Sequence, residues 1–182
     1  MLNKFRQKLA FELLVRLKRK TQNRKPDFVI SEQYMKRWWL LPKNPIMNVY
    51  YHEIKGSDLD RHLHDHPFFF AAFILEGGYD EHTTSGVEKR AAGDIYFHSP
   101  WKLHKLLMNE NEGASTIFVT LFKIRKWGFM TEEGWVPRNK YISEHGLQSQ
   151  IEHIDTEEPE YEKSSLDSVT IRINSWMRKL VN

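Results

Sequence analysis

The chain has 182 residues and a net charge of +3 at pH 7, with 27 basic against 24 acidic side chains. It contains no cysteine, which excludes disulfides, thiolate metal sites and a cysteine nucleophile. Hydrophobic residues make up 40% of the chain and aromatic residues 13%, so a core can be buried and global disorder is excluded. Any bound metal must therefore be held by histidine, carboxylate or water ligands.

The first stretch of the chain predicts a basic helix. Apolar residues recur at helical spacing over residues 2–20, and lysines and arginines lie between them. The members of this stripe are Leu2, Phe5, Leu9, Leu13 and Leu17. Because packing explains the stripe better than a nucleic-acid contact does, we expect no nucleic-acid partner.

No apolar run in the sequence is long enough to span a bilayer. The apolar positions near the N-terminus are interrupted by lysines and arginines, unlike those of a signal peptide. We therefore expect a cytoplasmic protein without a membrane span.

From residue 46 onward, short runs of β-branched and aromatic residues alternate with turn signals, one of them at Gly77-Gly78. The predicted strands are residues 46–54, 68–75, 79–84, 87–91, 95–97, 103–108 and 116–124. Many short strands at such spacing are typical of an antiparallel sandwich or barrel.

The chain is expected to have three parts. Residues 1–29 form the basic N-terminal helix, and residues 30–141 form the barrel, which opens with a short helix within 30–41. Residues 142–182 form an acidic loop and a C-terminal helix with an apolar stripe between Leu166 and Leu180.

The most informative segment is Asp60-Arg61-His62-Leu63-His64-Asp65-His66-Pro67. In an extended strand, the three histidines and Asp60 share one face. Adjacent imidazoles are costly to bury and repel each other when protonated, whereas a metal ion binds them as neutral ligands. The alternation therefore predicts a metal site, with a set of surface histidines as the alternative.

This segment is part of a wider pattern that resembles the two signature blocks of the cupin superfamily. The pattern reads Gly56…His64-Asp65-His66…Ile74-Leu75-Glu76-Gly77, followed by Gly93-Asp94-Ile95-Tyr96-Phe97…His104. Further motifs resemble a group of small uncharacterised cupin proteins of phages and bacteria. These motifs are Arg61, Leu63–Pro67, Gly77-Gly78-Tyr79 with Glu81, Trp127-Gly128-Phe129 and Gly134–Pro137. The resemblance implies an all-β, cupin-type double-stranded β-helix, a jelly-roll barrel, with flanking helices at both ends.

The resemblance also implies a ligand set, in one of two registers. The spacing from Gly56 favours His62 and His64 as the His-x-His pair, whereas the Gly77 turn and the narrower group favour His64 and His66. In both registers His104 is the histidine of the second block. In the second register the usual glutamate ligand falls at Phe70.

In that register, either three histidines bind the metal alone, or His62, Asp60 or Glu81 completes the coordination shell of the metal. We expect a divalent ion, either iron, nickel, zinc or manganese, at His64, His66 and His104, with His62 as a candidate fourth ligand.

Other polar residues carry weaker signals. Glu81 and Tyr79 are candidate catalytic acid/base residues, with a surface strand charge as the alternative for Glu81. His98, near a strand end ahead of Ser99-Pro100, is interpreted as a turn or rim histidine rather than a ligand. The pattern leaves open whether His52 faces the cavity or solvent.

The resemblance brings no established reaction. We expect a metal-dependent oxygenase or dioxygenase of the iron type acting on a small molecule, with a sugar isomerase or epimerase as the other enzymatic alternative. The third interpretation is a non-catalytic barrel that binds or senses a small molecule. A catalytic metal keeps an exchangeable position, whereas a structural one is closed by four protein ligands. Cupins often pair through edge strands, so a homodimer is a candidate assembly.

Overall fold

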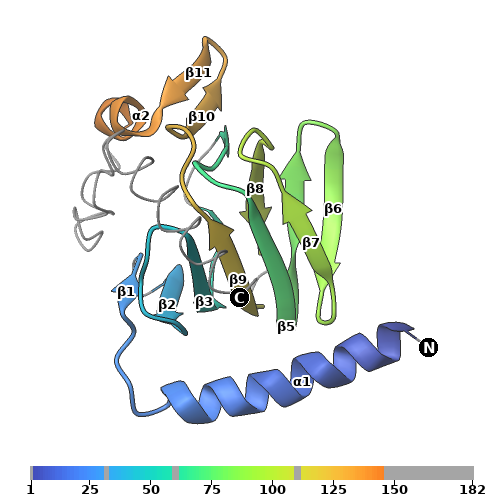
Figure 1. The fold of residues 1–182 in the computed structure, drawn as a ribbon. Helices are drawn as coiled ribbons and strands as arrows, with labels where there is room; N and C mark the ends of the chain where they lie inside the picture. The colour runs from blue at the N-terminus through green and yellow to red at the C-terminus, as the bar shows by residue number, and fades with distance from the viewer. Residues whose placement is uncertain (1, 31–32, 59–61, 109–111, 146–182) are drawn as a thin grey trace, which may run out of the picture.

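The computed structural model describes residues 2–30, 33–58, 62–108 and 112–145. The first half of the chain forms α1 (Leu2–Thr21), β1 (Phe28–Val29), β2 (Met35–Trp39), β3 (Met47–Ile54), β4 (Leu63–His64), β5 (Phe70–Thr83) and β6 (Gly86–Ala91). The second half forms β7 (Ile95–His98), β8 (His104–Leu107), β9 (Ala114–Leu121), β10 (Gly128–Thr131), β11 (Gly134–Pro137) and α2 (Arg138–Glu144). The strands curl into a barrel, with α1 along one side and α2 beside the β10–β11 hairpin at the other (Figure 1).

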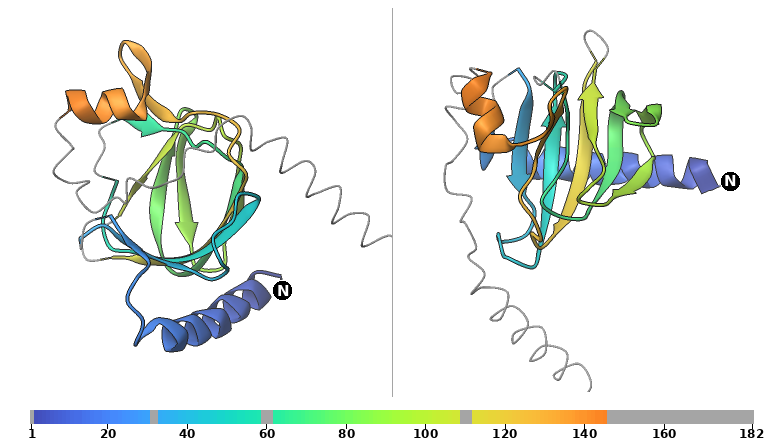
Figure 2. Two further views of the ribbon diagram at one scale, coloured as in Figure 1. Left: turned by 60° about the vertical axis from the view of Figure 1, so that its left-hand side comes forward. Right: turned by 90° about the horizontal axis from the view of Figure 1, so that it is seen from above.

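Strand β5 joins the two halves of the barrel. Its first part pairs with β9 and β7, and its second part pairs with β6 and β8. From β9 the sheet continues through β3 and β2 to β1, and from β8 it continues through β4 and β10 to β11. The strand pairs in the described part of the chain are antiparallel, and they close around a common interior (Figure 2). This topology confirms the predicted all-β, cupin-type barrel with flanking helices.

Gly77 and Gly78 lie inside β5, so the prediction of a turn at this point was wrong. The residues predicted as two strands, 68–75 and 79–84, form one continuous strand. Its register shifts between Ile74 and Glu76, and Gly77 has a φ of +68°. Such a bulge bends a strand without reversing it. The glycines therefore mark the point where β5 leaves one half of the barrel and enters the other.

The prediction of a short helix within residues 30–41 was also wrong, because strand β2 lies there. β2 pairs along its whole length with β3, and its side chains alternate between the two faces of the sheet. Met35 belongs to the inner core, whereas Trp38 packs on the outer side with Tyr51. Tertiary pairing thus outweighs the local helical pattern.

The outer face of the sheet is covered by α1. Ala10 and Leu14 of the helix are buried against Trp38, Tyr51 and Leu75. From the predicted apolar stripe, Leu13 and Leu17 also pack there, but Leu2 and Phe5 are 70% and 64% exposed. The described residues include no helix with the length and apolar character that a membrane crossing requires.

The described C-terminal helix is α2. The acidic loop and the predicted helix between Leu166 and Leu180 lie outside the described residues.

Candidate metal centre

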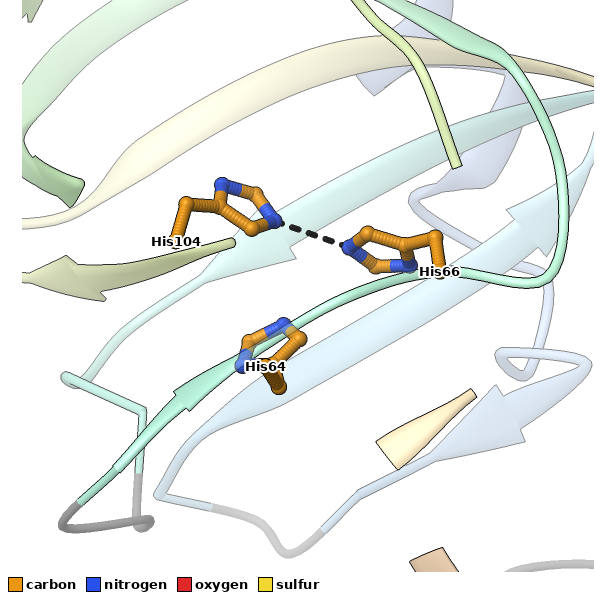
Figure 3. A group of neighbouring side chains, drawn as sticks. All are labelled: His64, His66 and His104. Atoms are coloured by element: carbon orange, nitrogen blue, oxygen red, sulfur yellow. Dashed lines mark hydrogen bonds between the residues drawn. The ribbon is translucent and has the colours of Figure 1, made fainter. Parts of the chain in front are cut away.

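Three histidines, from β4, the segment that follows it and β8, converge inside the barrel (Figure 3). His64 ends β4 and pairs directly with His104, the first residue of β8. His66 follows two positions after His64 and therefore returns to the same face. The ring centroids of the three imidazoles lie 5.0 to 5.2 Å from one another.

Asp65, between His64 and His66, points away from this cluster and anchors the segment. Its carboxylate accepts hydrogen bonds of 2.8 Å from the backbone N–H of Gly128 and from Nε1 of Trp135, and it forms an ion pair with Arg125. Asp65 is only 2% exposed. These contacts tie the His-x-His segment to the β10–β11 hairpin and fix the direction of both imidazoles.

The spacing of the nitrogen atoms fits a single metal ion. One ring nitrogen from each of the three histidines lies within 4.8 Å of the others. The Nε2 atoms of His66 and His104 are 2.8 Å apart, and two nitrogens bound to one ion at about 2.0–2.1 Å are separated by roughly 3 Å. In addition, Nδ1 of His64 is buried without a hydrogen-bond partner among the described residues. Three imidazoles are a donor set for borderline ions such as iron, nickel or zinc.

The surroundings keep two of these imidazoles neutral. Burial lowers the pKa of His66 well below its ordinary value, and the neighbouring His104, His64 and His98 lower it further. Burial also lowers the pKa of His104, although the nearby Glu81 opposes this shift. Neutral imidazole is the form that binds a metal ion, so the site is prepared for one near neutral pH.

Glu81 lies behind His104 and is fully buried. Its Oε1 accepts a hydrogen bond of 2.7 Å from Nδ1 of His104 and lies 2.5 Å from Nε2 of His98. Its Oε2 accepts a hydrogen bond of 2.8 Å from Nε of Arg90 and forms an ion pair with Nη2 of the same guanidinium at 2.7 Å. Burial alone would raise the pKa of Glu81, but the hydrogen bonds to His104 and His98 hold it well below the ordinary value. The proton on Nδ1 leaves the Nε2 lone pair of His104 facing the cluster.

His98 was not expected near the site. It is only 8% exposed, and its Nδ1 lies 2.8 Å from the carbonyl oxygen of Phe97. The available signal was its alternation with Tyr96, which places both side chains on the inner face of β7. Glu81, His98 and His104 form a second group whose ligand atoms lie within 4.8 Å of one another.

This second group is less suited to a metal than the three-histidine cluster. A neutral His104 has one lone pair, and its contact with Glu81 directs that lone pair toward His66. The guanidinium of Arg90 also occupies the other oxygen of Glu81 with a positive charge that would repel a cation.

The other residues singled out from the sequence lie apart from the three-histidine cluster. The Tyr79 hydroxyl is 2.8 Å from that of Tyr96, and burial raises the pKa of Tyr79, so it stays protonated. Nδ1 of His62 lies 2.9 Å from the Tyr141 hydroxyl, beside α2. Asp60 and Arg61 lie outside the described residues.

Aromatic rings surround the cluster. The ring of Trp127 is parallel to that of His66 at 6.3 Å, and Phe70 meets His66 edge-on at 4.8 Å. Phe129 lies 5.9 Å from His64. This apolar wall lowers the local dielectric and strengthens electrostatic interactions at the site.

No protein-family model matches the sequence, and no curated protein matches it. Solved structures that resemble the chain include a cupin 2 conserved barrel domain protein from Rhodopseudomonas palustris, with 19% identity and a TM-score of 0.46, covering 55% of this chain and 69% of that one. A cupin-2 domain protein from Rhodospirillum rubrum has 19% identity and a TM-score of 0.47, covering 56% and 69%. The polyketide cyclase RemF from Streptomyces resistomycificus has 14% identity and a TM-score of 0.47, covering 66% and 83%.

Proposed function

We propose that this barrel binds one divalent metal ion through His64, His66 and His104 and uses it to act on a small molecule. The observation that carries the proposal is the convergence of three imidazole nitrogens within 4.8 Å inside an aromatic wall. Neutral imidazoles in this arrangement are the ligands that such an ion requires.

The ligand count favours an enzyme over a closed structural site. His62 is hydrogen-bonded to Tyr141 rather than directed at the cluster, so the described residues supply three histidine ligands. A site with three protein ligands keeps positions for water or substrate, as catalytic sites do. A bound ion would supply Lewis-acid or oxygen chemistry there.

Among enzymatic reactions, an oxygenase type receives the most support. The ligand set holds no carboxylate, and the surrounding rings are apolar. An isomerase needs an acid and a base across the substrate. The candidates for those roles, Glu81 and Tyr79, are buried and hydrogen-bonded to other side chains.

Metal content of four single variants tests the site. His64→Ala and His66→Ala are expected to weaken metal binding by more than about 100-fold, because each removes a direct ligand. His98→Ala belongs only to the second group and should stay within about tenfold of the wild type. His62→Ala should bind as the wild type does. Elemental analysis of protein purified without an affinity tag, followed by metal titration, gives these values.

The opposite ranking, with His98→Ala losing the metal and His64→Ala keeping it, would place the ion at Glu81, His98 and His104. Oxygen uptake after Fe(II) reconstitution, screened with small molecules, then tests the reaction type. Metal binding without oxygen uptake would retain the metal site and reject the oxygenase.

A further inference from the structure

The outer face of the sheet is apolar over two successive rows of residues. Every second side chain of β3, β9, β5 and β7 points outward, and the pairing of these strands aligns such side chains in rows. The first row is Tyr51, Ile117, Phe73 and Ile95, and the second row is Val49, Val119, Ala71 and Phe97. The outer face of an antiparallel sheet is commonly polar where it meets water. Two apolar rows therefore indicate that another structure covers this face.

Helix α1 covers most of the first row and leaves the second row open. In the first row Tyr51 is buried, and Phe73 and Ile117 pack on the cluster that it forms with α1. In contrast, Phe97 at the end of the second row is 76% exposed. Beyond the second row, further apolar side chains lie at the same end of the sheet and are 38–43% exposed: Met47, Leu121 and Phe69. We call the second row and these three side chains the apolar floor.

One flank of α1 faces away from the apolar floor. Lys18 forms an ion pair of 2.6 Å with Glu76. Gln7 touches the turn at Gly93, where a Cβ would lie 2.9 Å from its side chain. Glu76 and Gly93 both lie beyond the first row, on the side opposite to the second row. Gln7 and Lys18 therefore mark the flank of the helix that points away from the floor.

The opposite flank of α1 borders the floor and is apolar. Leu9 precedes Lys18 by two and a half helical turns and therefore lies on the opposite side of the helix. Leu2 and Phe5 share that side with Leu9, because they are spaced by three and four residues. These side chains are 70%, 64% and 38% exposed for Leu2, Phe5 and Leu9. They form an apolar ridge beside the floor, on a helix that lies outside the barrel wall (Figure 2).

The ridge and the floor expose enough apolar area for a stable protein interface. Their aromatic side chains, together with Trp101 beside Phe69, are 43–76% exposed. At about 200 Å² for each aromatic side chain, they leave roughly 500 Å² exposed. The aliphatic side chains that add to this area are Leu2, Leu9, Met47, Ile95 and Leu121. A standard interface buries about 800 Å² on each partner, whereas the largest apolar patch of a typical monomer has about 300–600 Å².

The shape of this surface fits a second copy of the chain better than a flat membrane. A helix is about 10 Å thick, so a bilayer that touches the ridge stays clear of the floor beside it. A second copy carries the same ridge and the same floor, and a two-fold axis places each ridge on the other floor. We propose that the chain forms a symmetric dimer in which Leu2, Phe5 and Leu9 of each copy pack on the apolar floor of the other.

This dimer differs from one that pairs strand edges, because it uses the face of the sheet. The residues of the ridge and the floor are uncharged, so their contact buries no unpaired charge. The lysines and arginines between the ridge residues have long side chains, which keep their charges at the rim of the interface.

Sedimentation velocity of the full chain over a range of concentrations tests the proposal. The wild type should sediment as a dimer. Phe97→Glu on the floor and Phe5→Glu on the ridge should each weaken dimerisation at least about 100-fold, because each places two unpaired charges in the symmetric interface. Both side chains are exposed in a single copy, so the variants should stay folded, and thermal unfolding checks this.

Phe11→Glu is the matched control for Phe5→Glu. Phe11 is 64% exposed, as Phe5 is, and it lies on the same helix. Its spacing of four residues from Gln7 and seven from Lys18 places it on the flank that points away from the floor. Phe11→Glu introduces the same charge and should dimerise as the wild type does.

Three outcomes would overturn this dimer. The first is a monomeric wild type, including one that sediments with vesicles of phosphatidylserine and phosphatidylcholine, which would assign the surface to a membrane. The second is a dimer that survives both Phe97→Glu and Phe5→Glu, as pairing through strand edges would. The third is equal weakening by Phe5→Glu and Phe11→Glu, because the two flanks of α1 would then not differ.

Discussion

At the scale of single residues, the site depends on how Glu81 distributes its hydrogen bonds. One oxygen faces His104 and His98, and the other faces Arg90. Without the carboxylate of Glu81, each of these three partners would keep a buried polar group that has lost its hydrogen-bond acceptor. Glu81 is therefore better described as a residue that orients His104 than as a group that faces a substrate.

Glu81→Gln tests this role. The amide keeps the shape but loses the charge, so it no longer fixes the Nδ1 proton of His104 and leaves Arg90 without its buried counter-ion. We expect metal affinity to fall roughly 10- to 100-fold and the free energy of unfolding to fall by about 3 kcal/mol. Metal titration and denaturant unfolding measure the two effects.

Glu88→Gln is the matched control for this variant. Glu88 also accepts a hydrogen bond from Arg90, at 2.6 Å, but its side chain is 47% exposed. An exposed pair contributes about 0–1 kcal/mol, so this variant should keep both metal affinity and stability. Full metal affinity in Glu81→Gln would contradict the orienting role.

The closeness of His64 and His66 was predictable because its signal is local. His64 and His66 share a face by strand alternation alone, and that alternation is visible in the sequence. The arrangement around Glu81 was not predictable in the same way, since His98 and Arg90 come from β7 and β6. Only the pairing of both strands with β5 brings them to one carboxylate.

At the scale of elements, β5 shows that a pair of glycines can predict where a strand is irregular but not whether it turns or bulges there. The Gly77-Gly78 pair predicted an interruption of the strand, and the structure has a bulge at this point rather than a turn. The choice between the two depends on β9, whose residue Ala114 pairs with Gly77. β2 is a similar case. Its aromatic residues are compatible with a helix or a strand, and only the pairing with β3 decides for the strand.

Gly77→Ala tests whether the bulge requires glycine. Gly77 has a φ of +68°, and a Cβ there would lie 1.7 Å from the carbonyl oxygen of Gly113. The positive φ costs roughly 1–2 kcal/mol, and the clash forces the backbone of β5 and its neighbour apart. We expect a loss of unfolding free energy well above 2 kcal/mol, measured by denaturant unfolding.

Gly86→Ala provides the comparison, because Gly86 also has a positive φ, at 128°, but a Cβ at this position would meet nothing within 4 Å. It should show the backbone cost without the clash. Equal destabilisation by the two substitutions would mean that the close approach to Gly113 is relieved without cost.

At the scale of the whole molecule, the barrel buries histidines in neutral form, and this links its stability to pH. Burial lowers the pKa of both His52 and His66 well below the ordinary value of 6.5. Below about pH 6.5 the unfolded chain takes up protons that the folded chain refuses, so stability falls as pH falls. Above that pH both states hold neutral imidazoles, and this contribution is fully present.

The metal-free protein should therefore lose stability between pH 7.5 and pH 5.5, by up to about 1.4 kcal/mol per pH unit for each such histidine. Glu81 acts in a separate window. Its pKa is held below the ordinary value of 4.5, so its contribution is lost only at more acidic pH. Denaturant unfolding at pH 7.5, 6.5 and 5.5 measures the slope.

His66→Phe should reduce this slope by about one proton, because it removes one of the buried titrating groups and keeps an aromatic ring. Added metal should steepen the slope, since a bound ion stabilises the folded state and acid weakens its binding. A flat stability between pH 7.5 and pH 5.5 in metal-free protein would show that these imidazoles reach water in the folded state. The barrel would then lack the dry interior on which the proposed metal site depends.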